Sequence, residues 1–399
     1  MSTLFRCLTP SPACSKDGPF GLLESHSRLA SLNPLGDANR GAFLALQSAV
    51  STRRRLVATD PPERRASSCS WRRLSSTTGT LAHGLVSRVL LASPRGYCAG
   101  VERAVETVER ALSLHGAPVY VRKQIVHNAH VVRDLEARGA VFVDDERDVP
   151  RGATLVLSAH GVAPDVYDRA AGRDLHTIDA TCPLVTKVHV QARRYAADGH
   201  LVVLIGHAGH EEVVGTMGEA PDVTVLVQNI AEAEALELPA GAPVAYITQT
   251  TLSVDETTEI VDVLKRRFPH IRGPQREDIC YATSNRQWAV KELLGAVDLL
   301  LVIGSRNSSN SNRLVDVARA AGVPSYLIDD ETEIDEHWLE GIDTVGVTSG
   351  ASAPERLVDR VCDWFRAYGV GDISAFSSVY EDVVFRLPVE LRRAATPAA

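Results

Sequence analysis

Residues 89–100 read VLLASPRGYCAG, an apolar stretch that runs into a turn marked by proline and glycine and reaches Cys98. Apolar side chains then recur at helical spacing from residue 101 to residue 112, and Gly116 supplies a stop. The stretch therefore predicts a buried strand, a turn and a helix, with a cysteine at the corner. The same unit recurs along the rest of the chain.

Apolar strands and helical patterns alternate as far as residue 368. Strands are expected at 89–92, 118–122, 140–143, 154–158, 201–205, 223–227, 244–248, 298–303, 324–328 and 344–348. Helices are expected at 130–138, 184–197, 254–268, 285–295, 311–321 and 354–368. Because successive strands are separated by helices, the sheets should be mostly parallel and the fold class α/β.

Two further cysteines share the setting of Cys98. Cys182 lies in DATCPL and Cys280 in DICYAT, and each is expected to close a short strand and precede a helix. The remaining cysteines are Cys7, Cys14, Cys69 and Cys362. Such an odd, scattered set is no disulfide framework and favours a reducing compartment. Cys362 falls on the apolar face of a helix, where a free cysteine is usually a small buried hydrophobe.

The three corner cysteines divide the chain into comparable parts. We predict a leader at 1–85, lobes at 86–181, 182–279 and 280–367, and a C-terminal tail at 368–399 with a possible last strand at 383–385. Ligands of open α/β sheets collect outside the carboxyl ends of the strands. Three pseudo-equivalent lobes should therefore face a common centre in a trefoil-like arrangement, with one metal site between them.

Three thiolates suit either a cubane iron–sulfur cluster or zinc. Structural zinc sites usually show CxxC pairs, and this chain contains none. A cluster normally takes four protein ligands, so three would leave one iron open as a Lewis acid for a substrate.

Histidines form a second group at predicted strand ends. His127, His160, His207 and His210 each lie beside glycine or asparagine or in a glycine-rich turn. A lone histidine is more often packed or solvated, but several at strand ends favour an anionic ligand such as phosphate. Zinc held by His207 and His210 is the alternative.

Polar corners complete the candidate pocket. Glu211 and Glu212 follow His210; acids favour the first turn of a helix, but a carboxylate here is also placed to deliver protons. The other corners are 248–251, Thr283, 307–312 and 350–354. Each alone is an ordinary helix cap, whereas together they resemble the rim of a diphosphate pocket.

Charge is distributed unevenly along the chain. Residues 1–85 carry eleven Lys and Arg against five Asp and Glu, a charge of +6, so the total of −8 leaves −14 for the rest. The leader is rich in Ser, Arg and Pro without sustained periodicity, which predicts a disordered tail or a misassigned start, with a plastid transit peptide as the alternative to a cytoplasmic protein. The acidic balance argues against nucleic acid, and no apolar run approaches the roughly 20 residues of a membrane span.

Together the motifs closely resemble the LytB/IspH family of 4-hydroxy-3-methylbut-2-enyl diphosphate reductases. The matching stretches are SPRGYCAGVERAV, IVHN, SAHGV, DATCPLVTKVH, IGHAGHEE, GTMG, TQTTLSVDET, DICYATSNRQ, GSRNSSNSNRL and GASAPE. They occur in the family's order from about residue 88 to the C-terminus.

The resemblance implies three α/β lobes around one [4Fe–4S] cluster held by Cys98, Cys182 and Cys280, with one open iron. The residues implied for the diphosphate are His127, His160, His210, Ser308, Ser309, Asn310 and Ser352. Those implied around the substrate hydroxyl are Glu212, Thr250 and Thr283, supported by Gln249 and Thr251; Glu212, Thr250 and His210 are the expected catalytic group.

The implied reaction is a two-electron reductive dehydroxylation that yields isopentenyl and dimethylallyl diphosphates, the last step of the methylerythritol phosphate route. The implied electron donor is a ferredoxin or flavodoxin. Two features depart from typical bacterial members: Glu211 stands where they usually have proline, and the leader has no counterpart. A zinc hydrolase and a non-catalytic iron–sulfur carrier are the rival functions.

Overall fold

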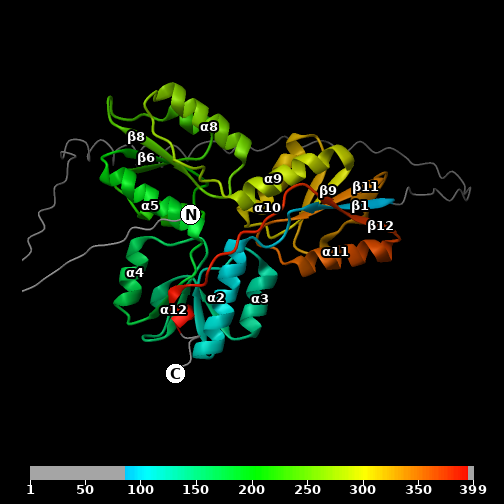
Figure 1. The fold of residues 1–399 in the computed structure, drawn as a ribbon, viewed down its shortest axis with the longest axis horizontal. Helices are drawn as coiled ribbons and strands as arrows, with labels where there is room; N and C mark the ends of the chain where they lie inside the picture. Colours follow the sequence, from blue (N-terminus) through cyan, green and yellow to red (C-terminus); the bar gives the residue numbers. More distant parts are fainter. Residues whose placement is uncertain (1–85, 394–399) are drawn as a thin grey trace, which may run out of the picture.

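The structure, a computed structural model, describes residues 86–393 and consists of three lobes, each built on one parallel sheet (Figure 1). The β2 lobe has the order β3 (Ala140–Val143), β2 (Val119–Arg122), β4 (Thr154–Leu157), β5 (His176–Asp179). The β6 lobe has the order β7 (Thr224–Val227), β6 (Leu201–Ile205), β8 (Val244–Thr248). The β9 lobe has the order β10 (Ser325–Ile328), β9 (Leu299–Ile303), β11 (Thr344–Ser349), β1 (Arg88–Ser93), β12 (Asp372–Ser377). The predicted α/β class with parallel sheets is confirmed.

The α-helices cover the faces of these sheets. They are α2 (Ala99–His115), α3 (Ala129–Ala137), α4 (Pro164–Ala171), α5 (Pro183–Ala197), α6 (Glu211–Gly218), α7 (Ile230–Ala235), α8 (Val254–Arg267), α9 (Tyr281–Leu293), α10 (Ser309–Ala320), α11 (Glu355–Tyr368) and α12 (Val389–Arg393). The helices absent from our expectations, α4, α6, α7 and α12, span eight residues or fewer, too few for a clear apolar period. No helix in the described part of the chain is both long and apolar enough to cross a membrane.

The sheet of the β9 lobe contains a strand that the predicted lobe boundaries assign to the first lobe. Strand β1 lies in the range predicted for the first lobe, yet it pairs with β11 on one side and β12 on the other. The physical reason is burial on both faces: Val89 packs in the core beneath α11, while Leu90 packs toward α9 and α10. A strand that is apolar on both faces is stable only inside a covered sheet.

The C-terminal strand was predicted in the wrong place. Residues 383–385 form no strand; the last strand is β12, Asp372–Ser377, within the range predicted as tail. β12 lies at the sheet edge with mostly exposed side chains, so its sequence lacks the apolar run that marks a buried strand.

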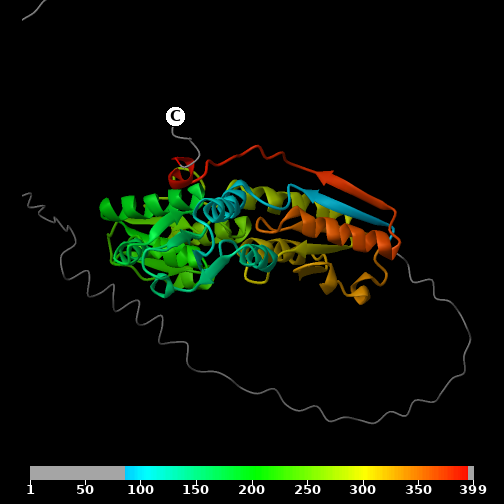
Figure 2. The same cartoon turned by 90° about the horizontal axis from the view of Figure 1, so that it is seen from below.

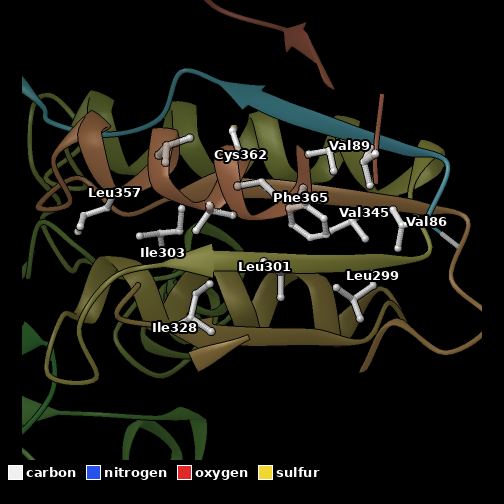
Figure 3. Packing of buried hydrophobic residues seen from close by; sticks show 14 of the residues in the cluster. Val86, Val89, Leu299, Leu301, Ile303, Ile328, Val345, Leu357, Cys362 and Phe365 are labelled. Atoms are coloured by element: carbon white, nitrogen blue, oxygen red, sulfur yellow. The ribbon is translucent and has the colours of Figure 1, made fainter. Parts of the chain in front are cut away.

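The core of the β9 lobe lies between the sheet and α11 (Figure 3). Phe365 is fully buried there against strand residues such as Leu301 and Val345. Cys362 shares this core at 4% exposure, which confirms its prediction as a buried hydrophobe. The leader, with Cys7, Cys14 and Cys69, lies outside the described residues.

The segment that follows β12 crosses from the β9 lobe to the β2 lobe and ends in α12, beside α2 (Figure 2). The fully buried Arg286 of α9 forms an ion pair with Glu381 and donates to the carbonyl of Gly96. Farther along, Arg103 of α2 donates to the carbonyl of Arg386, and Leu391 is buried in the β2-lobe core. The C-terminal segment therefore connects two lobes next to the corner that holds Cys98.

Candidate active site

Three helices, one from each third of the described chain, begin at the three corner cysteines. Cys98, Cys182 and Cys280 occupy the N-cap positions of α2, α5 and α9, and all three line one central cavity of about 100 Å³. Pro183 favours the start of α5, because its missing N–H would be unpaired there in any case. The positive ends of three helix dipoles therefore surround this cavity and favour negative charge inside it.

The settings of the cysteines are less alike than the sequence suggested. Cys182 follows β5 by three residues, as expected, but no strand precedes Cys280, so that expectation was wrong. The Cys280 N–H instead donates to the carbonyl of Thr250 at 3.1 Å. The loop after β8, rather than a strand of its own, holds Cys280 at the cavity.

Gly100 allows the thiols of Cys98 and Cys182 to approach α2. A Cβ at Gly100 would lie 2.7 Å from Cys182 Sγ and 3.8 Å from Cys98 Sγ. The first distance is shorter than any ordinary carbon–sulfur contact, so a larger residue would displace the Cys182 thiol. Gly100 is therefore required at this position because the Cys182 sulfur lies too close to its Cα to leave room for a side chain.

Burial controls the protonation of the thiols. Burial, with the nearby Cys98 as the second cause, raises the pKa of Cys182 to about 12 and that of Cys280 to about 11. Such thiols stay neutral near pH 7 unless a cation binds them, and a coordinating metal deprotonates a thiol outright. Three thiols on one cavity thus have the chemistry of a metal-ligand set.

A cluster of three histidines forms another wall of the cavity. The rings of His127 and His160 are stacked with centroids 4.1 Å apart, and His210 lies edge-on to them at 5.4 Å and 5.7 Å. They come from the loops after β2, β4 and β6, so two lobes contribute. Gln124 Oε1 and Asn307 Nδ2 each lie 3.3 Å from Nδ1 of His127.

Two of these imidazoles are neutral in the free protein. Burial, with the neighbouring His160 as the second cause, lowers the pKa of His127 to about 2 and that of His210 to about 3. The His210 Nδ1 accepts the backbone N–H of Glu212 at 3.2 Å and so caps α6. Each neutral ring keeps one N–H donor, which suits the oxygen of an anion in the cavity.

Glu211 and Glu212 are neighbours in sequence with different surroundings. Glu211 Oε2 lies 3.3 Å from Nδ1 of His160, and its side chain is 24% exposed. Glu212 is 2% exposed and accepts both the backbone N–H of Thr250, at 2.6 Å, and the Thr250 hydroxyl, at 3.0 Å. Burial raises the pKa of Glu212, and the hydrogen bonds from Thr250 oppose only part of that rise.

Small polar side chains close the remaining wall. The Thr283 hydroxyl lies 3.2 Å from Cys280 Sγ and 3.4 Å from Nδ2 of Asn310. Ser308 and Ser352 face each other at 3.5 Å, and Ser352 donates to the carbonyl of His127. These contacts connect the start of α10 to the thiol and histidine walls.

Gln249 is the predicted site residue that lies behind the cavity rather than on it. Its Nε2 donates to the Thr251 hydroxyl at 2.8 Å and lies 3.4 Å from Ser309 Oγ, while its Oε1 accepts the backbone N–H of His207. Ser309 in turn donates to the carbonyl of Thr251. Gln249 therefore holds two wall residues in place.

All other predicted site residues line the same cavity: Cys98, His127, His160, Cys182, His210, Glu212, Thr250, Thr251, Cys280, Thr283, Ser308, Ser309, Asn310 and Ser352. The sequence missed the backbone of Ala351, whose N–H donates to Asn310 and whose carbonyl accepts from Cys98. A residue that acts through its backbone can carry many different side chains, so the sequence gives no signal for it.

Within residues 86–393, no three His, Cys, Asp or Glu side chains converge on the position of a single metal ion, and His207 is not among the lining residues.

Comparisons with known proteins agree with this arrangement. The model of the LytB protein family matches residues 89–366. The chain belongs to the LytB family. This LytB match contains the three thiols, the three histidines and the polar wall, and it ends before β12.

Among LytB relatives, the 4-hydroxy-3-methylbut-2-enyl diphosphate reductase of Acidothermus cellulolyticus is 61% identical over 307 residues, which cover 77% of this chain and 90% of that protein. The enzyme of the same name from Nocardia farcinica is 56% identical over 319 residues, with coverage of 80% and 95%. A solved structure, the E-1-hydroxy-2-methyl-but-2-enyl-4-diphosphate reductase from Plasmodium falciparum, superposes with a TM-score of 0.76 at 39% identity and covers 77% of this chain and 98% of its own. LytB proteins use an iron–sulfur cluster.

Proposed function

We propose that the protein is a reductase that converts 4-hydroxy-3-methylbut-2-enyl diphosphate into isopentenyl and dimethylallyl diphosphates. The observation that carries the proposal is the single cavity whose walls are three thiols, three histidines and the buried Glu212–Thr250 pair. The names of the LytB relatives support the same activity. A zinc hydrolase receives no such support from these relatives, and His207, one of the two histidines of that alternative, is not among the residues that line the cavity.

The proposed cofactor is one [4Fe–4S] cluster held by Cys98, Cys182 and Cys280, with the fourth iron open. The donor set supports this choice, because three cysteine thiols line one cavity and the chain has none of the CxxC pairs usual in structural zinc sites. When bound, the cluster supplies electrons and a Lewis-acid position for the substrate hydroxyl.

The proposed diphosphate site is the wall of histidines, serines and Asn310. Neutral His127 and His210 offer ring N–H donors, and Ser308 and Ser352 offer hydroxyls. The N-terminus of α10, a helix of 12 residues, adds backbone N–H groups and a positive dipole end at the same wall. These groups would hold the substrate's anionic end and orient its hydroxyl toward the thiols.

The proposed proton donor is Glu212, acting through Thr250. The Thr250 hydroxyl lies 3.0 Å from Glu212 Oε2, and the raised pKa of the buried carboxyl suits a group that must carry a proton. The reaction consumes two electrons and two protons, breaks the C–O bond, releases water and forms one C–H bond. The carboxyl and its threonine would deliver the proton that lets the hydroxyl leave as water.

The proposed electron donor is a ferredoxin or flavodoxin, and the proposed compartment is the cytoplasm, with a plastid as the alternative if residues 1–85 are a transit peptide. Both proposals derive from the LytB relationship and the composition of the chain.

The direct test is turnover of the allylic diphosphate by anaerobically purified protein, with reduced methyl viologen as the electron source. We expect both isopentenyl and dimethylallyl diphosphates, and loss of turnover in Cys182→Ser. A protein that holds iron and sulfide but forms neither product would contradict the reductase and favour the non-catalytic carrier.

A further inference from the structure

A basic groove runs along α5 on the β6 lobe. It has a volume of about 580 Å³ and is lined by Lys187, Val190, Gln191, Arg194, Tyr195, Arg272, Gly273, Gln275 and Arg276. Four of these residues are cationic and none is acidic, although the whole chain carries a net charge of −8. The lining of the groove is therefore positively charged on a protein whose net charge is negative.

Two of the four cations are unpaired within residues 86–393. Arg194 and Arg276 are exposed, and no described carboxylate lies within ion-pair distance of either guanidinium, although Glu277 neighbours Arg276 in sequence. Arg272 reaches Asp198 only at 3.8 Å. Positive charge is thus available to an acidic ligand in the groove.

The groove lies close to two of the cavity thiols. Leu184 and Val185, in the first turn of α5 after Cys182, line the cavity, while Lys187, about 7.5 Å along the helix axis from Cys182, already lines the groove. Lys187 also lies 3.0 Å from Asp278, two residues before Cys280. In Figure 1, α5 runs outward from the region where the three lobes meet. Helix α5 therefore contributes residues to both the groove and the cavity.

We propose that this groove is the docking site for an acidic electron-carrier protein, an inference that rests on the proposed reductase function. Each docked carrier would be oxidised by one electron, so two dockings supply the two electrons that reduce the substrate, and the two protons come from Glu212 and solvent. Val190, 49% exposed in the groove, adds an apolar contact that a small anion would not need. Complementary charge at such a surface accelerates encounter and is sensitive to salt.

A second groove is larger than the first, but most of its positive charge is paired with carboxylates. It is larger, about 810 Å³, and lies beside Tyr97 between α2, α3 and the start of α11. Its lining mixes Glu102, Glu106, Glu109 and Asp134 with Arg110, Arg138 and Arg356. Arg138 is paired with Glu109 and Arg356 with Asp134, so this groove offers an acidic partner little attraction.

The test compares a double charge reversal in each groove, Arg194→Glu/Arg276→Glu and Arg110→Glu/Arg138→Glu. An acidic ferredoxin is the probe, and two readouts are used: its binding in the oxidised form by calorimetry, and turnover driven by its reduced form or by reduced methyl viologen. We expect the first pair to weaken ferredoxin binding and to raise its KM by about tenfold or more, with viologen-driven turnover unchanged. The second pair should leave all values within about twofold of the unaltered protein.

Unchanged ferredoxin binding in Arg194→Glu/Arg276→Glu overturns the proposal, as does a loss confined to the other pair. Equally strong binding of a single-stranded oligonucleotide would mean a general polyanion surface and also overturns it. Because the binding readout needs no catalysis, these outcomes differ from failure of the proposed function, in which viologen supports no product in the unaltered protein.

Discussion

Cysteines that are at least partly buried occur in two regions of the described chain, and their surroundings differ. Cys362 lies in the β9-lobe core among aliphatic and aromatic side chains contributed by one sheet and its helices (Figure 3). Cys182 and Cys280 lie at helix N-termini on a cavity shared by all three lobes, beside histidines, hydroxyls and a carboxyl. The difference shows that burial alone does not assign a role to a thiol, whereas a helix start and convergent polar groups do.

The largest effect should come from replacing one cysteine in each of the two regions. Cys182→Ser removes one of three proposed ligands, so we expect loss of bound iron and of at least about 99% of turnover. Cys362→Ala should keep iron and turnover and lose only about 1–2 kcal/mol of unfolding free energy, as expected for a small core cavity. Iron analysis, turnover and chemical denaturation measure these effects; an intact cluster in Cys182→Ser would implicate another thiol.

A large effect is also expected from Gly100→Ala, because its new Cβ would lie 2.7 Å from Cys182 Sγ. We expect iron content to fall to less than about half, since ligand displacement weakens a metal site. Gly295→Ala is the matched control, because nothing lies within 4 Å of the added carbon and its backbone is not left-handed. Equal iron content in both variants would mean that α2 can shift to admit the methyl group.

The proton pathway gives the next prediction. Glu212→Gln should lower kcat by about 10²–10⁴-fold with iron content and substrate binding kept, because the amide retains the shape of the pair with Thr250 but carries no acidic proton. In the unaltered protein, kcat should fall as pH rises through the raised pKa of Glu212, where the proton is lost. Full activity of the variant across this pH range would remove Glu212 from the pathway.

The smallest effect should come from Glu211→Pro, which removes the first of the two adjacent carboxyl groups at the start of α6. Proline is well tolerated at the first helical position, which residue 211 occupies in α6. The Glu211 carboxylate lies 3.3 Å from Nδ1 of His160, so the substitution removes one partly exposed negative charge and this single contact, and KM should change by less than about threefold. A tenfold rise in KM would show that the Glu211–His160 pair positions the substrate.

Much of the fold and nearly all of the cavity were predictable from the sequence. Apolar runs such as 201–205 and 244–248 became strands with the same bounds, because strands buried on both faces need continuous apolar side chains. The family's motifs indicated the residues of the cavity, which now lie on its walls, apart from Gln249. A position behind the wall depends on side-chain direction, which motif spacing does not encode.

Features set by tertiary partners were not predictable. The place of β1 between β11 and β12 is fixed by which helices cover its two faces, and none of the three, α9, α10 and α11, is near it in sequence. β12 is exposed and lacks an apolar signal. The loop that carries Cys280 is held through the carbonyl of Thr250, a backbone contact without a sequence motif.

The central claim is that Cys98, Cys182 and Cys280 together hold a cluster rather than a single ion. The most direct test measures iron and acid-labile sulfide per chain in protein purified without oxygen. We expect about four of each, the stoichiometry of a cubane cluster. Stoichiometric zinc without acid-labile sulfide would contradict it and return the cavity to the hydrolase interpretation.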